Sequence, residues 1–497
     1  MPQFRNFHQR TLLIPQSTAN VHIRVIDAAS GQPTPVRLYI GDDDGNAYVP
    51  FGYWPRFPTG RNESVGAQIY WAGKKYSYID GGCEAELPVG VPLTFEISKG
   101  PEYQTIRQTT VVKPGQLALR FAIERWIDSR ENGWESADLR CHFLSPHDAL
   151  LQARAEGLGA VHLLLTEHDT PSIDGHLYRN VPHLAAFGGQ RPVLDSDGTV
   201  VYVNTLNSHP ALGRVALLHS HRPIFPLSFG DDGRPDDWSI CDWCDQCHRK
   251  GGLTVWSEPF KRTAGEALVA AILGKIDAIE WDAADLSQPF LPAYYRLLNA
   301  GIVLPLVGSS GKDSNRMAMG SKRTYTRLPN DPAVPGAWVP QIKSGQSFVT
   351  DGPLLDWHVG VGHNKSVIVD ATARHSKTIV KLEVVANGVV VAISVGTSSA
   401  PFTATLTHEF DPDFSGWWAI RCRAVGDEVA FAHSSPNRVE GREMIDRRVR
   451  DSFVRTIENV VDWVENVATY ADPRRRVQML ERCRLALDKL ALNADSQ

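Results

Sequence analysis

Cysteine is scarce in this sequence. Seven cysteines in 497 residues, an odd number, do not supply the paired framework of a disulfide-rich secreted protein, so reduced thiols are expected. The first 25 residues hold only a short apolar stretch from Leu12 to Pro15, which is too short for the core of a signal peptide. We therefore expect a cytoplasmic protein.

Long hydrophobic runs and an excess of one charge are also missing. Apolar runs such as GAVHLLLT are far below the roughly 20 residues that cross a bilayer, so they predict buried strands and no membrane partner. Lys and Arg number 51 against 56 Asp and Glu, and a net charge of -5 gives no basic footprint for nucleic acid. A small-molecule substrate or an anionic ligand is the expected partner.

The pattern of apolar and polar residues divides the chain into four regions. Apolar and polar residues alternate with period two in the first region, change to strand-helix alternation near Ser136, return to period two after Lys322, and end in a helical pattern. The predicted parts are an N-terminal β-sandwich (1–130), an α/β barrel (131–330), a C-terminal β-sandwich (331–437) and a helical tail (438–497). The apolar stripe of the tail fits packing on its own chain or in a homo-oligomer.

The α/β region contains four helix-to-strand passages, which predict a parallel sheet or barrel. In such folds the active site lies at the carboxyl ends of the strands. Polar residues follow the predicted strands at these ends, namely Arg140, His142, Glu167, His168, Asp169, His209, Glu258, Glu280 and Ser309 to Asp313. We expect these side chains to meet in one site.

The strand-end motifs resemble those of the polymerase-and-histidinol-phosphatase (PHP) superfamily. In chain order they are DLRCH, TEHD, NSHP, WSEP, DAIEW and LVGSSGKDSN. The chain is most similar to its carbaryl-hydrolase-like (CehA/McbA) group, and the resemblance extends to the SGQSFVTDGPLL passage, the AHSSP turn and the tail. It implies a distorted (β/α)7 barrel in which metal-bound hydroxide attacks an ester, amide, carbamate or phosphoester.

Several motif positions depart from the family pattern. Arg140 replaces the first histidine of Asp-x-His-x-His, Glu167 replaces an aspartate, Glu258 replaces the histidine of Ala-His-Pro, and Lys312 stands near the terminal histidine. A guanidinium has no lone pair to offer and repels a divalent cation. Glu167 and Glu258 could ligate a metal, or they could pair with Arg140 and Lys312 and neutralise the cavity without one.

Two hypotheses follow. In the first, a hydrolase keeps one Zn²⁺ or Mn²⁺ on a reduced ligand set, with Glu167 handling protons. The residues assigned to it are His142, His168, His209 and Glu258 as metal ligands, Glu167, His168 and Asp313 as catalytic residues, and Arg140 and Lys312 as an anion clamp. In the second, the chain is a non-catalytic binding or scaffold protein whose metal-free, salt-bridged barrel mouth is held by Arg140, Glu167, Glu258 and Lys312.

Two further motifs are explained by helices. CDWCDQCH has zinc-like intervals, but its helical context spaces the cysteines at i, i+3 and i+6 and spreads them around a helix, with no partner pair elsewhere. In SPHD, Ser145 is a predicted N-cap, Pro146 the first helical residue and Asp148 the residue at the third position. Neither motif is predicted to bind metal.

Overall fold

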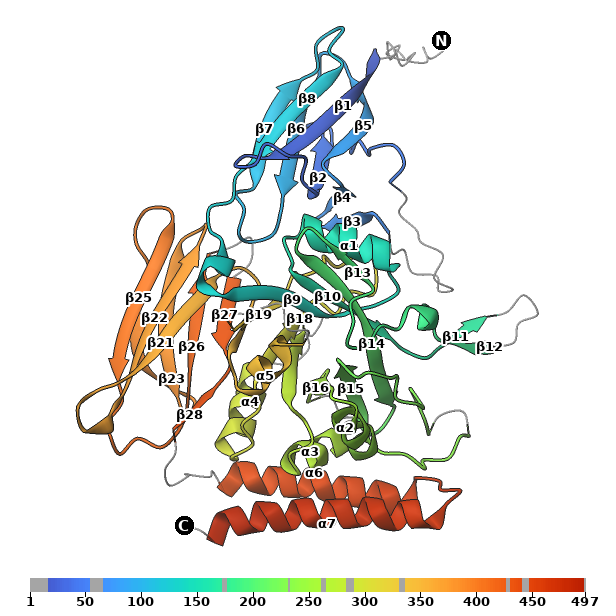
Figure 1. Ribbon diagram of the computed structural model, residues 1–497, viewed down its shortest axis with the longest axis vertical. Helices are drawn as coiled ribbons and strands as arrows, with labels where there is room; N and C mark the ends of the chain where they lie inside the picture. Colours follow the sequence, from blue (N-terminus) through green and yellow to red (C-terminus); the bar gives the residue numbers. More distant parts are fainter. Residues whose placement is uncertain are drawn as a thin grey trace, which may run out of the picture.

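The computed structural model describes residues 17–53, 66–171, 177–230, 233–260, 265–282, 290–329, 336–425, 430–439 and 447–495. Strands account for 41% and helices for 22%. Figure 1 shows the N-terminal strands at one end of the long axis and the helices α6 (Arg447–Asn466) and α7 (Pro473–Asp495) at the other. The protein is therefore mostly β.

Two sheets make up the N-terminal region. Their orders are β5-β1-β8 and β3-β4-β2-β6-β7, and one apolar core holds residues of both, among them Val25, Leu38 and Phe95. Buried and exposed residues alternate along much of β1 and β5, which gives these strands one buried face, as period two predicts. The strands are β1 (Thr18–Asp27), β2 (Val36–Gly41), β3 (Gln68–Trp71), β4 (Lys74–Ile79), β5 (Gly82–Pro88), β6 (Pro92–Ser98), β7 (Ile106–Val111) and β8 (Ala118–Ile123).

A single large sheet runs through the rest of the molecule in the order β18-β17-β16-β15-β14-β10-β9-β19-β20-β27-β26-β23-β24. Its first part consists of β9 (Trp134–Cys141), β10 (Ala160–Leu165), β14 (Thr199–His209), β15 (Gly213–Leu218), β16 (Leu253–Ser257), β17 (Ala278–Asp282) and β18 (Leu306–Ser309). The helices α1 (Pro146–Ala155), α2 (Ile240–Arg249), α3 (Gly265–Ile272) and α4 (Phe290–Asn299) precede β10, β16, β17 and β18 along the chain. These are the four predicted helix-to-strand passages.

The predicted (β/α)7 barrel is wrong. None of the sheets closes into a barrel. The turn 210–212 between β14 and β15 is too short for a crossover, so these two strands pair antiparallel, and β15 also pairs antiparallel with β16. On the other side, β9 pairs antiparallel with β19 (Arg323–Arg327), and the sheet continues through β20 (Ser347–Thr350) into the C-terminal region. An isolated bridge between Cys141 and Lys312 links the end of β9 to the loop after β18.

The C-terminal β region packs the end of the large sheet against a three-stranded sheet of order β21-β22-β25. Trp357, Val369 and Ile420 belong to the core shared by the two sheets. The strands are β21 (Leu354–Val361), β22 (Val367–His375), β23 (Ile379–Ala386), β24 (Val389–Ser394), β25 (Phe402–Glu409), β26 (Gly416–Ala424), β27 (Ala430–Ser434) and β28 (Asn437–Val439). The short elements that remain are β11 (His168–Pro171), β12 (Leu177–Asn180), β13 (Leu194–Ser196) and α5 (Trp338–Lys343).

The helical tail packs on its own chain. Val449, Phe453 and Ile457 of α6 are buried in the same core as α3, while Val467, just after the helix, is 63% exposed. The apolar stripe of α6 is thus largely covered by this chain. Among the described residues, no helix is long and apolar enough to cross a membrane.

Both helix predictions are confirmed. Ser145 is the N-cap of α1 and its hydroxyl accepts the Asp148 N–H, with Pro146 at the first helical position. The CDWCDQCH cysteines lie on α2, and all seven cysteines of the chain are free and buried. Cys241, Cys244 and Cys247 share one buried face of α2, so they are not spread around the helix as predicted.

Candidate functional site

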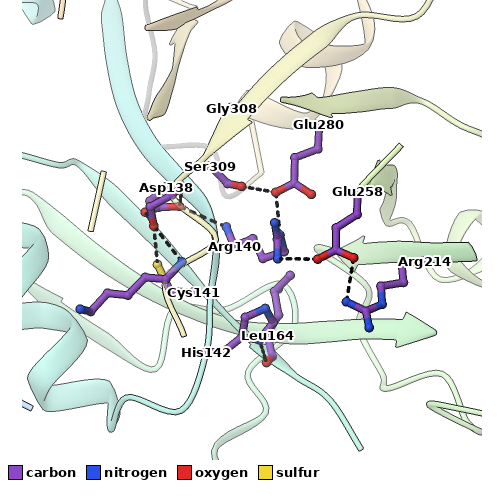
Figure 2. Close-up of polar contacts among 12 residues, drawn as sticks. Asp138, Arg140, Cys141, His142, Leu164, Arg214, Glu258, Glu280, Gly308 and Ser309 are labelled. Carbon is purple, nitrogen blue, oxygen red and sulfur yellow. Dashed lines mark hydrogen bonds and ion pairs between the residues drawn. The ribbon is translucent and has the colours of Figure 1, made fainter. Parts of the chain in front are cut away.

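Residues of β9, β15 and β17, and the residue that follows β16, bring a cluster of charged side chains together around Arg140 (Figure 2). Arg140 is 5% exposed, and its Nε donates a 2.7 Å hydrogen bond to Oε1 of Glu280. Its Nη1 lies 3.8 Å from Oε1 of Glu258, which also receives a 2.8 Å hydrogen bond from Arg214 on its other oxygen. Two guanidinium groups and two carboxylates therefore balance one another. We call Arg140, Arg214, Glu258 and Glu280 the Arg140 cluster.

The glutamates of the Arg140 cluster are held differently. Glu280 is 2% exposed, and its Oε1 also accepts a hydrogen bond from the Ser309 hydroxyl. Glu258 is less buried and sits just after β16 with a φ of 49°. Phe143 and Phe260, which also follow strands, have φ values of 64° and 65°. Left-handed backbone at non-glycine residues costs free energy and recurs where strand ends carry function.

His142 is neutral. Burial, together with the nearby charge of Arg140, lowers the pKa of His142 to about 3. Its Nδ1 lies 3.0 Å from the Leu164 carbonyl, which can only accept, so Nδ1 carries the proton and Nε2 has the lone pair. This is the tautomer that metal-binding histidines use. His142 is thus chemically able to ligate, although its nearest charged neighbour is a cation.

Asp138 fastens β9 to the loop after β18. This buried carboxylate accepts N–H groups from Ser310 at 3.0 Å and Gly320 at 2.7 Å, and the Ser310 hydroxyl as well. Burial raises the pKa of Asp138, and these hydrogen bonds oppose the rise. The aspartate of the DLRCH motif therefore holds a loop in place.

Lys312 does not reach the Arg140 cluster as an anion clamp. Its side chain is fully buried, and its Nζ donates to the carbonyls of Ser314 at 3.0 Å and Met317 at 2.8 Å. Burial lowers the pKa of Lys312 to about 8. Asp313, the predicted general base, is exposed on the same loop. The ammonium of Lys312 is used to close its own turn.

Glu167 and His168 follow β10. Glu167 accepts the Ser228 hydroxyl, and its Oε2 lies 3.5 Å from Nη1 of Arg234. His168 begins β11 and pairs in register with Asn180, but its side chain lies outside the described residues. Glu167 thus has an arginine partner supplied by a loop that the sequence did not single out.

His209 lies in a separate cluster at the end of β14. Its Nε2 is 2.9 Å from Oδ1 of Asp236, and its Nδ1 accepts the N–H groups of Ala211 and Leu212 at 3.1 and 3.0 Å. Asp236 also accepts the Thr469 N–H from the turn between α6 and α7. Both ring nitrogens are therefore used, and no lone pair is left for a metal.

The predicted Zn²⁺ or Mn²⁺ site does not fit these residues. Within the described part of the chain, no three His, Cys, Asp or Glu side chains are grouped so that they could hold a metal ion. Of the predicted ligands whose side chains are described, His209 is saturated by hydrogen bonds, Glu258 is paired with two arginines, and His142 alone presents a suitable nitrogen. The side chains of the Arg140 cluster supply their own cations instead.

Two important residues were missed as site residues. Glu280 was recognised as a strand-end acid, but its role as the closest partner of Arg140 was not predicted. Asp236 lies in a loop, and no sequence pattern links it to His209 or to the tail. By contrast, the pairing of Glu258 with Arg140 is confirmed.

Comparison with known proteins does not show a family for this chain. No protein-family model matches the chain, and no curated protein matches it. The resemblance to the PHP superfamily therefore depends on the sequence motifs alone, namely the order of the strand-end motifs and the similar passages that follow them.

Proposed function

We propose that this chain is a non-catalytic binding or scaffold protein whose strand-end site is held by the Arg140 cluster. The observation that supports it is the buried ion pair of Arg140 with Glu280, joined by Glu258. A guanidinium keeps its proton in proteins, so it occupies the site as a permanent cation. The proposal includes descent from PHP-type hydrolases, based on motif order, without the barrel.

The ligand that suits this site is a small anion. Arg214 is 48% exposed at the rim and uses one nitrogen on Glu258, so the rest of its planar fork can meet a carboxylate or phosphate. The buried Arg140 sets the position of Glu258, and Glu258 in turn orients Arg214. We further propose a cytoplasmic location, which the seven free, buried cysteines support.

A second candidate function is a metal-dependent hydrolase of the carbaryl-hydrolase-like type. One observation favours it, the neutral His142 with its lone pair on Nε2. His142 would be one residue holding a divalent ion, which would supply Lewis-acid chemistry suited to hydrolysis of an ester, amide, carbamate or phosphoester.

Metal titration separates the two candidates. The full-length protein is treated with chelator and titrated calorimetrically with Zn²⁺ and with Mn²⁺, beside a His142→Gln variant. The binding-protein proposal expects no stoichiometric uptake in either protein, and no metal-stimulated hydrolysis of ester or phosphoester substrates. One ion per chain, lost in His142→Gln and accompanied by hydrolysis, would establish the hydrolase instead.

A further inference from the structure

The strand β24 forms an outer edge of the large sheet. It stands last in the strand order, pairs with β23, and no described strand pairs with its other edge. Figure 1 shows β23 and β26 at the flank of the molecule, in the C-terminal β region. The segment from Asn387 to Ala400, which contains β24, has no Asp, Glu, Lys or Arg. An unpaired strand edge offers backbone N–H and C=O groups to another strand.

Apolar side chains are exposed along this edge. The exposed fractions are 65% for Val389, 39% for Val390, 43% for Val391, 58% for Ile393 and 72% for Val395. Successive residues of a strand point to opposite faces, so both faces of the strand present apolar surface. Soluble proteins usually protect such edges with charged residues or proline. The only protective feature here is a register shift, which leaves Val391 as an extra residue opposite β23.

We propose that β24 pairs antiparallel with β24 of a second copy of this chain, about a two-fold axis. In such a pairing each strand meets its own sequence, so any charge on the edge would approach the same charge on the copy. A segment without charges is the composition that this arrangement requires. Backbone hydrogen bonds join the two strands, and the exposed valines and isoleucine are covered together.

The size of the contact sets its expected strength. A single strand edge buries less than the roughly 1,200–2,000 Å² of standard stable interfaces. The dimer should therefore dissociate on dilution, with a dissociation constant on the order of micromolar rather than nanomolar.

The edge strand β21 of the facing sheet provides a matched control. Val359 of β21 is 53% exposed, similar to the valines of β24, and lies on the edge strand of the facing sheet. Histidine flanks it at His358, and His363 and Lys365 follow the strand. Val359→Lys thus places a lysine on an exposed edge valine outside the proposed contact, as Val391→Lys does inside it.

Sedimentation velocity of the full chain over a wide concentration range tests the proposal. We expect a monomer-dimer equilibrium for the native protein and for Val359→Lys. Val391→Lys and Val391→Glu should each weaken the dimer at least tenfold, because like charges meet across the axis. An equimolar mixture of these two variants should dimerise again, since opposite charges then face one another.

Each outcome has a clear meaning. Far-UV and near-UV circular dichroism of the variants must match the native protein, which separates loss of pairing from loss of fold. A native protein that is monomeric throughout the range would overturn the proposal and would leave the edge to a different partner. A dimer that persists in Val391→Lys, or one that Val359→Lys disrupts, would also overturn it.

Discussion

The Arg140 cluster and the His209–Asp236 pair occupy the ends of strands in the same sheet, yet they use polar residues in different ways. Arg140 is enclosed by carboxylates from β17 and the end of β16, so the cluster neutralises charge within the sheet. His209 uses Asp236 to connect β14 with the turn between α6 and α7. Residues expected to share one metal ion thus divide between charge balance and tail docking.

This difference shows how strand-end residues in a metal-like motif order can have partners other than a shared metal ion. A buried cation needs a matching acid, and Glu280 supplies it directly. A buried imidazole needs partners for both nitrogens, and His209 finds them in Asp236 and in the backbone that follows it. The two clusters use different partners, and Oε2 of the buried Glu280 has no hydrogen-bond partner among the described residues, so the consequences of breaking the clusters should differ in size.

The largest effect is expected from Arg140→Met. The substitution leaves Glu280, 2% exposed, without its cation, and removing one partner of a buried pair costs about 3–5 kcal/mol in the free energy of unfolding. Urea unfolding followed by fluorescence measures this loss. A change below about 1 kcal/mol would show that the pair is not a buried structural ion pair.

Asp236→Ala should have the next largest effect and should act on the tail. It removes the acceptor of the His209 ring and of the Thr469 N–H, with an expected cost of about 2–3 kcal/mol. Hydrogen exchange should show lower protection in α6 and α7 than in β9. Asp411→Ala, which changes an exposed acid, is the control. It should leave the free energy of unfolding within about 0.5 kcal/mol of native and the hydrogen-exchange protection of α6 and α7 unchanged. Equal loss of protection in all elements would contradict a local docking role.

The pH dependence of stability should report on His142. Its pKa in the folded state, about 3, lies below the unfolded value near 6.5, so the unfolded chain binds a proton first as the pH falls. The contribution is complete above pH 6.5 and is lost progressively toward pH 3, with a loss on the order of 2 kcal/mol between pH 6.5 and 5. The free energy of unfolding of His142→Gln should depend less steeply on pH in this window. His358→Gln, at an exposed position, should keep the native slope.

Glu258→Gln should have the smallest effect. Its partner Arg214 is half exposed, and its contact with Arg140 spans 3.8 Å, so the expected cost is about 0.5–1 kcal/mol. The difference from native should shrink as ionic strength rises, which urea unfolding at two salt concentrations measures. A cost as large as that of Arg140→Met would mean that Glu258, and not Glu280, is the main partner of Arg140.

Local sequence patterns were enough to predict much of the secondary structure. The capping of α1 by Ser145 and the alternation of the strands depend on neighbours in sequence, so both were predictable. The open sheet depends on the antiparallel pairing of β9 with β19, which joins residues far apart in the chain. No local pattern distinguishes that pairing from the closure of a barrel.

The site was predictable to a similar extent. Strand-end position and charge were enough to predict that Glu258 would pair with Arg140. The pairing of Arg140 with Glu280 joins β9 and β17, which are far apart in the chain, and the pairings of His209 and Glu167 depend on loops, so neither kind was predictable. Asp236 and Arg234 reach His209 and Glu167 from the segment before α2, and their approach is set by tertiary packing alone.

A double-mutant cycle on Arg140 and Glu280 tests the central claim most directly. The free energies of unfolding of the native chain, Arg140→Met, Glu280→Gln and the double variant give the coupling between the two side chains. The Arg140 cluster predicts a coupling of about 2–3 kcal/mol, so that the double variant is more stable than Arg140→Met. Additive effects, with a coupling below about 0.5 kcal/mol, would contradict the view that a buried arginine–glutamate pair holds this site.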